Sequence, residues 1–187
     1  SIPFIGKNIF KSMSFINYLF YFKSNISKDR IVSLEKVLYP LSFITDTRNV
    51  SPERKIIQVQ FSIPDNEKSY LEELINLLIH NQKPLLCSIK KLNNSKNYKN
   101  LSFHQNGWTV AVDFSYKYFN NSSIRHFYKK LIKHNGKVYL AKDSTLNSKE
   151  FKEMYPEYYQ WIKIIKKIDP NNIYQSKLSN RLEIKKW

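Results

Sequence analysis

Polar side chains alternate with apolar ones along several short segments, and these polar residues have the types and spacing to do chemistry. Gln58 and Gln60 flank Val59, Lys90 follows an apolar run, and Tyr139 lies between two aliphatic residues. Because successive side chains of a strand point to opposite sides, each polar set shares one face. Amides, an amine and a phenol on one face can bind a ligand by hydrogen bonds and charge. The residues of this face, called the platform below, are Gln58, Gln60, Ser88, Lys90, Thr109, Ala111, Asp113, Tyr139 and Ala141.

A solvated sheet face is the alternative to a ligand platform, since antiparallel sheets often leave one face in water. Solvated faces usually carry long charged and β-branched side chains, whereas this face has paired glutamines beside a lysine, an alanine and a tyrosine. That composition favours ligand binding. Lys142 shares the alternation of the apolar Val138 and Leu140, so it reaches the platform only if its strand ends or twists there.

Other kinds of site have little support in the spacing of residues. His80, His104, His126 and His134 have no metal-ligand spacing with one another or with Cys87, and each is expected at the surface or at a helix end. The three glycines are isolated and cannot form a phosphate-binding loop, and no nucleophile elbow occurs. The sequence therefore predicts no metal site and no nucleotide-binding loop of its own.

The elements that must position the platform follow in the order strand, helix, strand, strand, helix, strand. This βαββαβ order predicts an α+β, ferredoxin-like fold, in which an antiparallel sheet carries both helices on one face. The strands are expected at residues 55–63, 85–92, 108–116 and 137–142, and the helices at residues 66–80 and from Asn121 to Gly136, where the glycine is expected to be left-handed.

The apolar residues of the same strands are expected to form the core under the helices. On the strands they are Ile57, Val59, Phe61, Leu85, Cys87, Ile89, Trp108, Val110, Val112, Phe114, Val138 and Leu140. On the helices they are Leu71, Leu74, Ile75, Leu78, Ile124, Phe127, Tyr128 and Leu131. Cys87 is accordingly predicted to be a small core residue.

The C-terminal region is predicted to be helical and to follow known rules of helix initiation and termination. Asn147 and Glu150 have the spacing of a capping box, which accounts for Glu150 although it could pair on paper with Asp143. Leu146 and Phe151 have the spacing of a hydrophobic staple. A second helix with a stripe of Trp161, Ile164, Ile165 and Ile168 is expected to stop at Asp169-Pro170.

The N-terminal segment 5–24 reads as an amphipathic helix, and residues 38–43 and 45–55 read as a connection. We therefore expect two parts, residues 1–45 with the helix and residues 46–187 with the main domain. A membrane-surface role for the helix is the weaker interpretation, because its polar face lacks a continuous basic stripe.

Composition leaves several partners open. The formal net charge of +16 fits nucleic acid, an anionic membrane or a phosphorylated substrate, and a compositional bias toward lysine and asparagine is the competing explanation. A single cysteine cannot form an internal disulfide.

No apolar stretch is long enough to span a membrane and no signal peptide is seen, so we expect a cytoplasmic or peripheral membrane location. The start at Ser1 suggests an excised piece of a longer protein.

Three stretches together resemble a known family. IIQVQFSIP, GWTVAVDF and the series VYLAKDS, MYP and IDP are similar, in order and spacing, to the C-terminal half of FAD-linked oxidases of the vanillyl-alcohol-oxidase type. The resemblance covers residues from about 38 to the end. It implies that this chain forms the substrate domain over a flavin, and that a separate FAD-binding domain, in cis or in trans, holds most of the cofactor.

The resemblance also implies residue roles. Gln58 and Gln60 would face flavin and substrate, Lys90 would contact the substrate near the reacting hydroxyl, Tyr139 would line the pocket, and Lys142 would reach flavin or substrate. Thr109 and Ala111 stand where relatives often have asparagine and cysteine, so they would line the pocket wall and alter its specificity. Val59 replaces an aromatic residue between the glutamines.

The function implied is oxidation of a sugar or alcohol hydroxyl by hydride transfer to FAD, with a polyprenyl-phosphoryl ribose, reacting at its 2-hydroxyl, as the expected substrate. Lys90 and Tyr139 are the candidate catalytic residues, and the residues do not decide which of them is the base. The positive charge would suit an anionic lipid phosphate, and a short-chain reductase could complete an epimerisation.

The sequence leaves two other functions open. An RNA-binding module of the RNA-recognition type shares the βαββαβ order, but it needs aromatic residues on the open sheet face. Trp108 and Phe114 are instead predicted on the helix-covered face, so nucleic acid is not the favoured partner. The chain could also be an inactive fragment of an oxidase.

Overall fold

The computed structural model describes residues 18–19, 21–22, 31–35, 55–80, 82, 84–93 and 101–185. The chain divides into two compact units, Ser1–Arg54 and Lys55–Trp187. In the first unit Tyr18, Leu19, Tyr21 and Phe22 are helical, as expected for the segment 5–24, and the rest of that predicted helix lies outside the described residues, as does the connection before Lys55.

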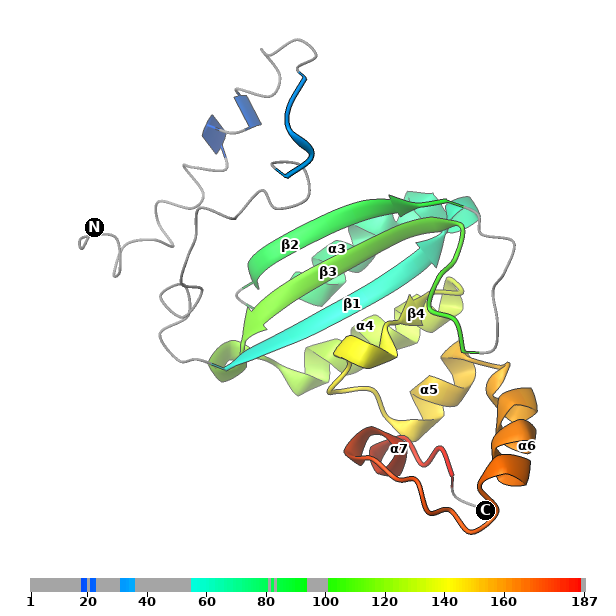
Figure 1. Cartoon of the computed structure of the whole chain (residues 1–187). Coiled ribbons are helices and arrows are strands. Elements are labelled where there is room, and N and C mark those ends of the chain that lie inside the picture. The colour runs from blue at the N-terminus through cyan, green and yellow to red at the C-terminus, as the bar shows by residue number, and fades with distance from the viewer. Residues whose placement is uncertain are drawn as a thin grey trace. The chain divides into compact units, whose positions relative to one another are not determined.

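A four-stranded antiparallel sheet forms the centre of this unit (Figure 1). Its strands are β1 (Ile56–Pro64), β2 (Pro84–Leu92), β3 (Gly107–Ser115) and β4 (Lys137–Val138), in the order β2-β3-β1-β4. β1 pairs antiparallel with both β3 and β4, and β2 pairs antiparallel with β3. The predicted α+β fold of ferredoxin-like order is therefore confirmed.

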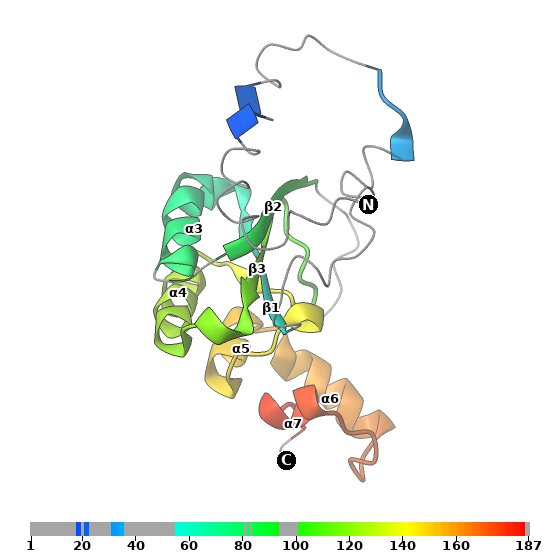
Figure 2. The same ribbon diagram turned by 90° about the vertical axis from the view of Figure 1, so that its left-hand side faces the viewer.

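Helices α3 and α4 both lie on one face of the sheet, and neither covers the opposite face (Figure 2). A 3-10 helix (Asp65–Tyr70) leads into α3 (Leu71–Ile79), and α4 spans Asn121–Lys133 behind the N-cap Asn120. The Asn120 side chain accepts hydrogen bonds from two backbone N–H groups and caps the helix, which begins at Asn121 as expected. Buried residues shared by the sheet and these helices include Val59, Phe61, Ile63, Leu74, Leu78, Val110, Val112, Phe114, Ile124, Phe127, Tyr128, Leu131 and Val138.

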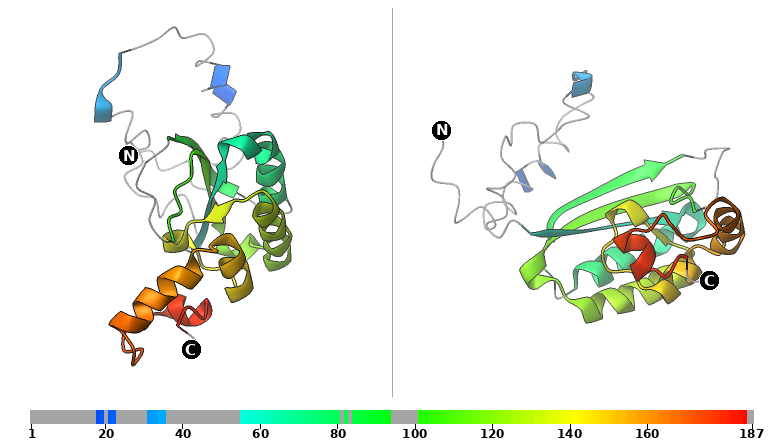
Figure 3. Two further views of the ribbon diagram at one scale, coloured as in Figure 1. Left: turned by 90° about the vertical axis from the view of Figure 1, so that its right-hand side faces the viewer. Right: turned by 60° about the horizontal axis from the view of Figure 1, so that its bottom comes forward.

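Three further helices follow β4: α5 (Ser148–Met154), α6 (Tyr158–Ile168) and α7 (Lys177–Arg181) (Figure 3). The capping box of Asn147 and Glu150 is present, and α6 ends at Ile168 with Asp169 as its C-cap, so it stops where predicted. The apolar stripe of α6 is only partly covered, because Ile164 and Ile168 are 49% and 70% exposed.

The first correction concerns the edge strand β2. Cys87 and Ile89 pair with Val112 and Val110, so they lie on the helix side as the alternation requires. They are nevertheless exposed, Ile89 at 49%, because α3 and α4 do not cover this edge. The prediction that Cys87 and Ile89 are core residues is therefore wrong.

Two more corrections concern the segment around β4. The strand ends at Val138, and Leu140–Lys142 forms a 3-10 helix, so Ala141 is not part of the sheet. Asn135, with φ of 53°, takes the left-handed position after α4. Gly136 is required for a different reason: a Cβ there would lie 2.9 Å from the Ser62 carbonyl oxygen and would overlap the Leu131 side chain.

Candidate functional site

The register of the sheet brings the predicted platform residues together in rows. Gln58 pairs with Asp113, and Gln60 pairs with Ala111, which in turn pairs with Ser88 of β2. Thr109 pairs with Lys90. Directly paired residues share a face, so seven of the nine predicted residues form one surface across β1, β3 and β2, on the face opposite α3 and α4.

Tyr139 extends this surface beyond the end of β4. Its backbone N–H donates to the Gln60 carbonyl oxygen at 2.8 Å, which continues the β1–β4 register by one residue. The ring therefore lies on the Gln60 side of the sheet. Its centroid is 4.9 Å from that of Phe103, so an aromatic pair stands at this end of the platform.

A loop segment covers part of the same end. Ser62 Oγ lies 3.0 Å from the Phe103 carbonyl oxygen and 2.9 Å from Gln105 Oε1, and Gln105 Nε2 donates to the Asn135 carbonyl oxygen at 2.8 Å. Ser62 is fully buried beneath these contacts. Residues 101–106 thus lie against one end of the platform (Figure 1), whereas Lys90 and Ser88 on β2 are exposed.

Hydrogen bonds between neighbouring strands hold the two glutamines. Gln58 Nε2 donates to Asp113 Oδ1 at 2.5 Å, and Gln60 Nε2 donates to Thr109 Oγ1 at 3.0 Å. Thr109 is only 4% exposed, and its hydroxyl also donates to the Phe61 carbonyl oxygen at 2.9 Å. Thr109 therefore supports Gln60 from below the surface, whereas the glutamines themselves are half-buried.

The two lysines predicted for the site are placed at its margins. Lys90 is exposed at the β2 edge, and among the described residues no carboxylate pairs with it. Its neighbour Lys91 faces the other way, where it pairs with Asp65 and lies 5.0 Å from the Trp108 ring centroid. Lys142 is exposed at the end of the 3-10 helix. Because β4 ends at Val138, the strand alternation does not hold Lys142 on the helix side of the sheet.

The arrangement has the chemistry of a polar binding surface. It offers amide carbonyls, one carboxylate, one phenol and a lysine amine on a partly covered face. Within the part of the chain that the structure describes, no three His, Cys, Asp or Glu side chains come together in a way that could hold a metal ion. Binding and orientation of an organic ligand are therefore what this surface can do without help from another domain.

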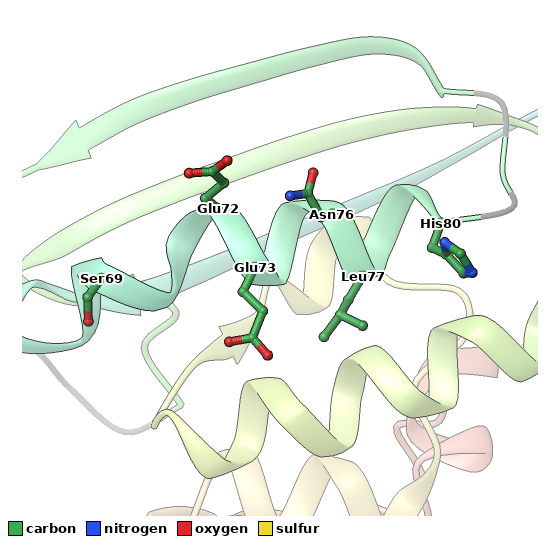
Figure 4. A pocket seen from close by; sticks show the side chains of 6 residues that line it. All are labelled: Ser69, Glu72, Glu73, Asn76, Leu77 and His80. Carbon is green, nitrogen blue, oxygen red and sulfur yellow. The ribbon is translucent and has the colours of Figure 1, made fainter.

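A separate hollow of about 560 Å³ lies along the outer side of α3 (Figure 4). Its lining residues all come from one segment: Ser69, Glu72, Glu73, Asn76, Leu77 and His80. Glu73 Oε1 is already 2.8 Å from Lys130 Nζ, and this hydrogen bond lowers the pKa of Glu73. Among the residues that the structure describes, no second element lines this hollow, so we assign the site to the platform and not to the hollow.

The motif residues that follow Tyr139 have structural partners. The Asp143 side chain is fully buried, accepts hydrogen bonds from the backbone N–H groups of Thr145 and Leu146, and lies 2.7 Å from Arg181. Tyr155 donates its hydroxyl to the Val138 carbonyl oxygen at 2.6 Å, and burial raises its pKa well above the usual range. These residues fasten the C-terminal helices to β4 and take no part in the platform.

Sequence reasoning missed Ser62, Phe103 and Gln105. Ser62 shares the alternation of Gln58 and Gln60, so a strand extended by one polar position would have included it. Phe103 and Gln105 lie in a segment with no regular pattern, and only the fold brings them to the platform. Leu86, which pairs with Asp113, also lies on this face.

Comparisons with known proteins agree with the resemblance carried by the motifs. Residues 100–182 match the D-arabinono-1,4-lactone oxidase family. Decaprenylphosphoryl-β-D-ribose oxidase of Mycolicibacterium smegmatis is 27% identical over 172 residues, which is 90% of this chain and 37% of that protein. The chain thus resembles the C-terminal region of an FAD-linked oxidase and spans little more than a third of this relative.

Proposed function

We propose that this chain is the substrate-binding portion of an FAD-dependent oxidoreductase that oxidises a sugar or alcohol hydroxyl. The observation that carries the proposal is the platform itself: Gln58, Gln60 and Tyr139 lie side by side on a sheet face that α3 and α4 leave uncovered, with Lys90 at its edge. The oxidase from Mycolicibacterium is similar over 90% of the chain, and the family match at residues 100–182 includes β3 and Tyr139 but neither β1 nor β2.

The cofactor fits the platform only in part. Glutamine carbonyls and a lysine can contact a flavin ring or a substrate, but three isolated glycines provide no loop for a pyrophosphate. FAD would therefore be held mainly by a separate domain, in cis or in trans, with Gln60 and Lys142 reaching toward it from this chain. When bound, FAD would supply the hydride acceptor.

The chain's own residues would bind the substrate and handle its proton. Gln58 and Gln60 would hold the hydroxyl groups, with Ala111 in the wall of the site and Thr109 supporting Gln60 from beneath. Lys90 and Tyr139 are the candidates for taking the proton of the reacting hydroxyl.

The substrate class follows from the name of the Mycolicibacterium relative, and a polyprenyl-phosphoryl ribose that reacts at its 2-hydroxyl is the specific candidate. Its phosphate would suit the net charge of +16. No helix in the described residues is both long and apolar enough to cross a bilayer. A short-chain reductase that returns the oxidised sugar to an alcohol would complete an epimerisation.

The experiment is to join this chain to the flavin-binding part of the Mycolicibacterium relative, purify the fusion and record its flavin absorbance. Anaerobic addition of the ribose substrate should bleach the flavin. An unchanged spectrum in a fusion that holds flavin would refute the proposed function and favour an inactive fragment.

Two adjacent lysines supply a matched pair of variants. Lys90→Ala should lower the bleaching rate by about 10²-fold or more, if Lys90 handles the proton, while flavin stays bound. Lys91→Ala removes the same charge from the opposite side of β2 and should leave the rate near that of the parent. Equal rates in the two variants would remove Lys90 from the mechanism.

An RNA-binding function would suit the net charge of +16 and the βαββαβ order, but the open face of the described strands lacks the aromatic residues that it needs. Base stacking needs accessible aromatic rings on the open sheet face. On the described part of that face, Tyr139 is in contact with Phe103, and the β3 residues Trp108 and Phe114 lie on the helix side.

A further inference from the structure

The side-chain amide of Gln58 has an orientation that chemistry dictates. Its partner, Asp113 Oδ1, belongs to a carboxylate, which can only accept hydrogen bonds when ionised. The amide nitrogen must therefore face Asp113, at the observed 2.5 Å, because the carbonyl oxygen in that place would bring two acceptors together. Oε1 of Gln58 is left directed elsewhere.

The orientation of the Gln60 side-chain amide is also fixed by its hydrogen-bond partner, which here is a hydroxyl group. The Thr109 hydroxyl carries one hydrogen, and it donates this hydrogen to the Phe61 carbonyl oxygen at 2.9 Å. Toward Gln60 the hydroxyl can only accept. The nitrogen of Gln60 therefore faces Thr109 at 3.0 Å, and its Oε1 is also left directed elsewhere.

Both carbonyl oxygens are available to a ligand. Among the described residues, no donor reaches Oε1 of either glutamine. Neither oxygen is among the buried, unpaired side-chain atoms of that part of the chain, which belong to Gln82, His134, Glu157 and Asn172. Since the two glutamines are two residues apart on β1, their backbones are about 7 Å apart, a distance that one sugar ring can bridge.

We infer that Asp113 and Thr109 are positioning residues that turn Gln58 and Gln60 so that both present hydrogen-bond acceptors to the ligand. The group bound over β1 must then supply donors, and the hydroxyl groups of a sugar do so. A phosphate group does not fit this place, because the two carbonyl oxygens and the Asp113 carboxylate repel an anion. This inference rests on the proposed function, since it specifies which part of the substrate lies on the platform.

The orientation can be tested by NMR on the 187-residue chain through the side-chain amide signals of both glutamines. Thr109→Val keeps the shape of the side chain but removes the hydroxyl. It should move the Gln60 signals toward those of a glutamine side chain that has no fixed hydrogen-bond partner. Thr109→Ser keeps the hydroxyl and should preserve them. Asp113→Ala and Asp113→Asn form the corresponding pair for Gln58, because asparagine retains an acceptor oxygen. Unchanged signals in both Thr109→Val and Asp113→Ala would overturn the inference.

The ligand class is tested with two probes, methyl β-D-ribofuranoside and its 2,3-di-O-methyl derivative, which keeps the oxygens but loses the two donors. The chain should bind the free diol about three- to tenfold more tightly, as expected for one or two ordinary hydrogen bonds. Thr109→Val should reduce this ratio toward one, and Thr109→Ser should keep it. A general loss of structure would weaken both probes alike, so the ratio reports on positioning.

The outcomes separate this inference from the proposed function. Selectivity for the free diol in a chain whose flavin fusion is inactive would refute the oxidase function and leave the inference standing. Intact amide orientations without selectivity, or without binding of either probe, would overturn it even if the flavin fusion is active.

Discussion

Gly107 offers a sharp test of how the sheet holds the platform. It begins β3 opposite Pro64, the last residue of β1, and it is buried. A Cβ at this position would lie 2.8 Å from Pro64 Cα and 2.9 Å from the Asp65 backbone nitrogen, and it would overlap the Ile63 carbonyl oxygen. All three obstacles are backbone atoms, so no side-chain rotation can relieve Gly107→Ala.

The expected cost is at the upper end of the range for overpacking. Inserting a methyl group into a packed site costs about 1–3 kcal/mol, and the absence of any flexible neighbour here argues for about 3 kcal/mol or more. That is a large part of the roughly 5–15 kcal/mol that stabilises a domain, and it corresponds to a fall in melting temperature of roughly 10 °C. The strain acts at the β1–β3 pairing, which sets the Gln58–Asp113 register.

Urea unfolding followed by circular dichroism and tryptophan fluorescence measures this cost, and Trp108 is a reporter next to the substituted residue. Asn106→Ala is the matched control, because Asn106 is exposed and its backbone carbonyl, which accepts from the Asp65 N–H, is retained. A Gly107→Ala midpoint that coincides with that of Asn106→Ala would refute the close approach of the two strands.

Three further predictions concern the periphery of the domain. A hydrogen bond from Lys185 lowers the pKa of Asp169 in the folded chain, so Asp169 should stabilise the fold above its unfolded pKa and lose this effect as the pH falls through the lower folded pKa. Asp169→Asn should therefore reduce the fall of the urea midpoint between pH 6 and pH 2. An unaltered fall of the midpoint would contradict the pairing. Asn147→Ala removes the cap of α5 and should cost about 1 kcal/mol in thermal unfolding, whereas Ser148→Ala should cost less; equal losses would speak against the cap. Cys87 is exposed, so a maleimide should label the native chain without denaturant, and labelling only after unfolding would show that the β2 edge is covered in solution.

The sequence was sufficient for the order of elements and for the side of the sheet on which most residues lie. Alternation assigned Val59 and Phe61 to the core and Gln58 and Gln60 to the opposite face, because a strand has a strict period of two and a one-residue error would reverse every side chain. The capping box at Asn147 was readable for a similar reason, since its atoms are all within four residues.

Only the tertiary structure decided how much of the sheet the helices cover, where β4 ends and which way the glutamine amides face. Cys87 has the alternation of a core residue, but its exposure depends on how far α3 and α4 extend across the sheet. The segment after Val138 alternates like a strand, yet it turns into a 3-10 helix that leads toward α5. The directions of the Gln58 and Gln60 amides depend on partners about 50 residues away in the sequence, which no local pattern can report.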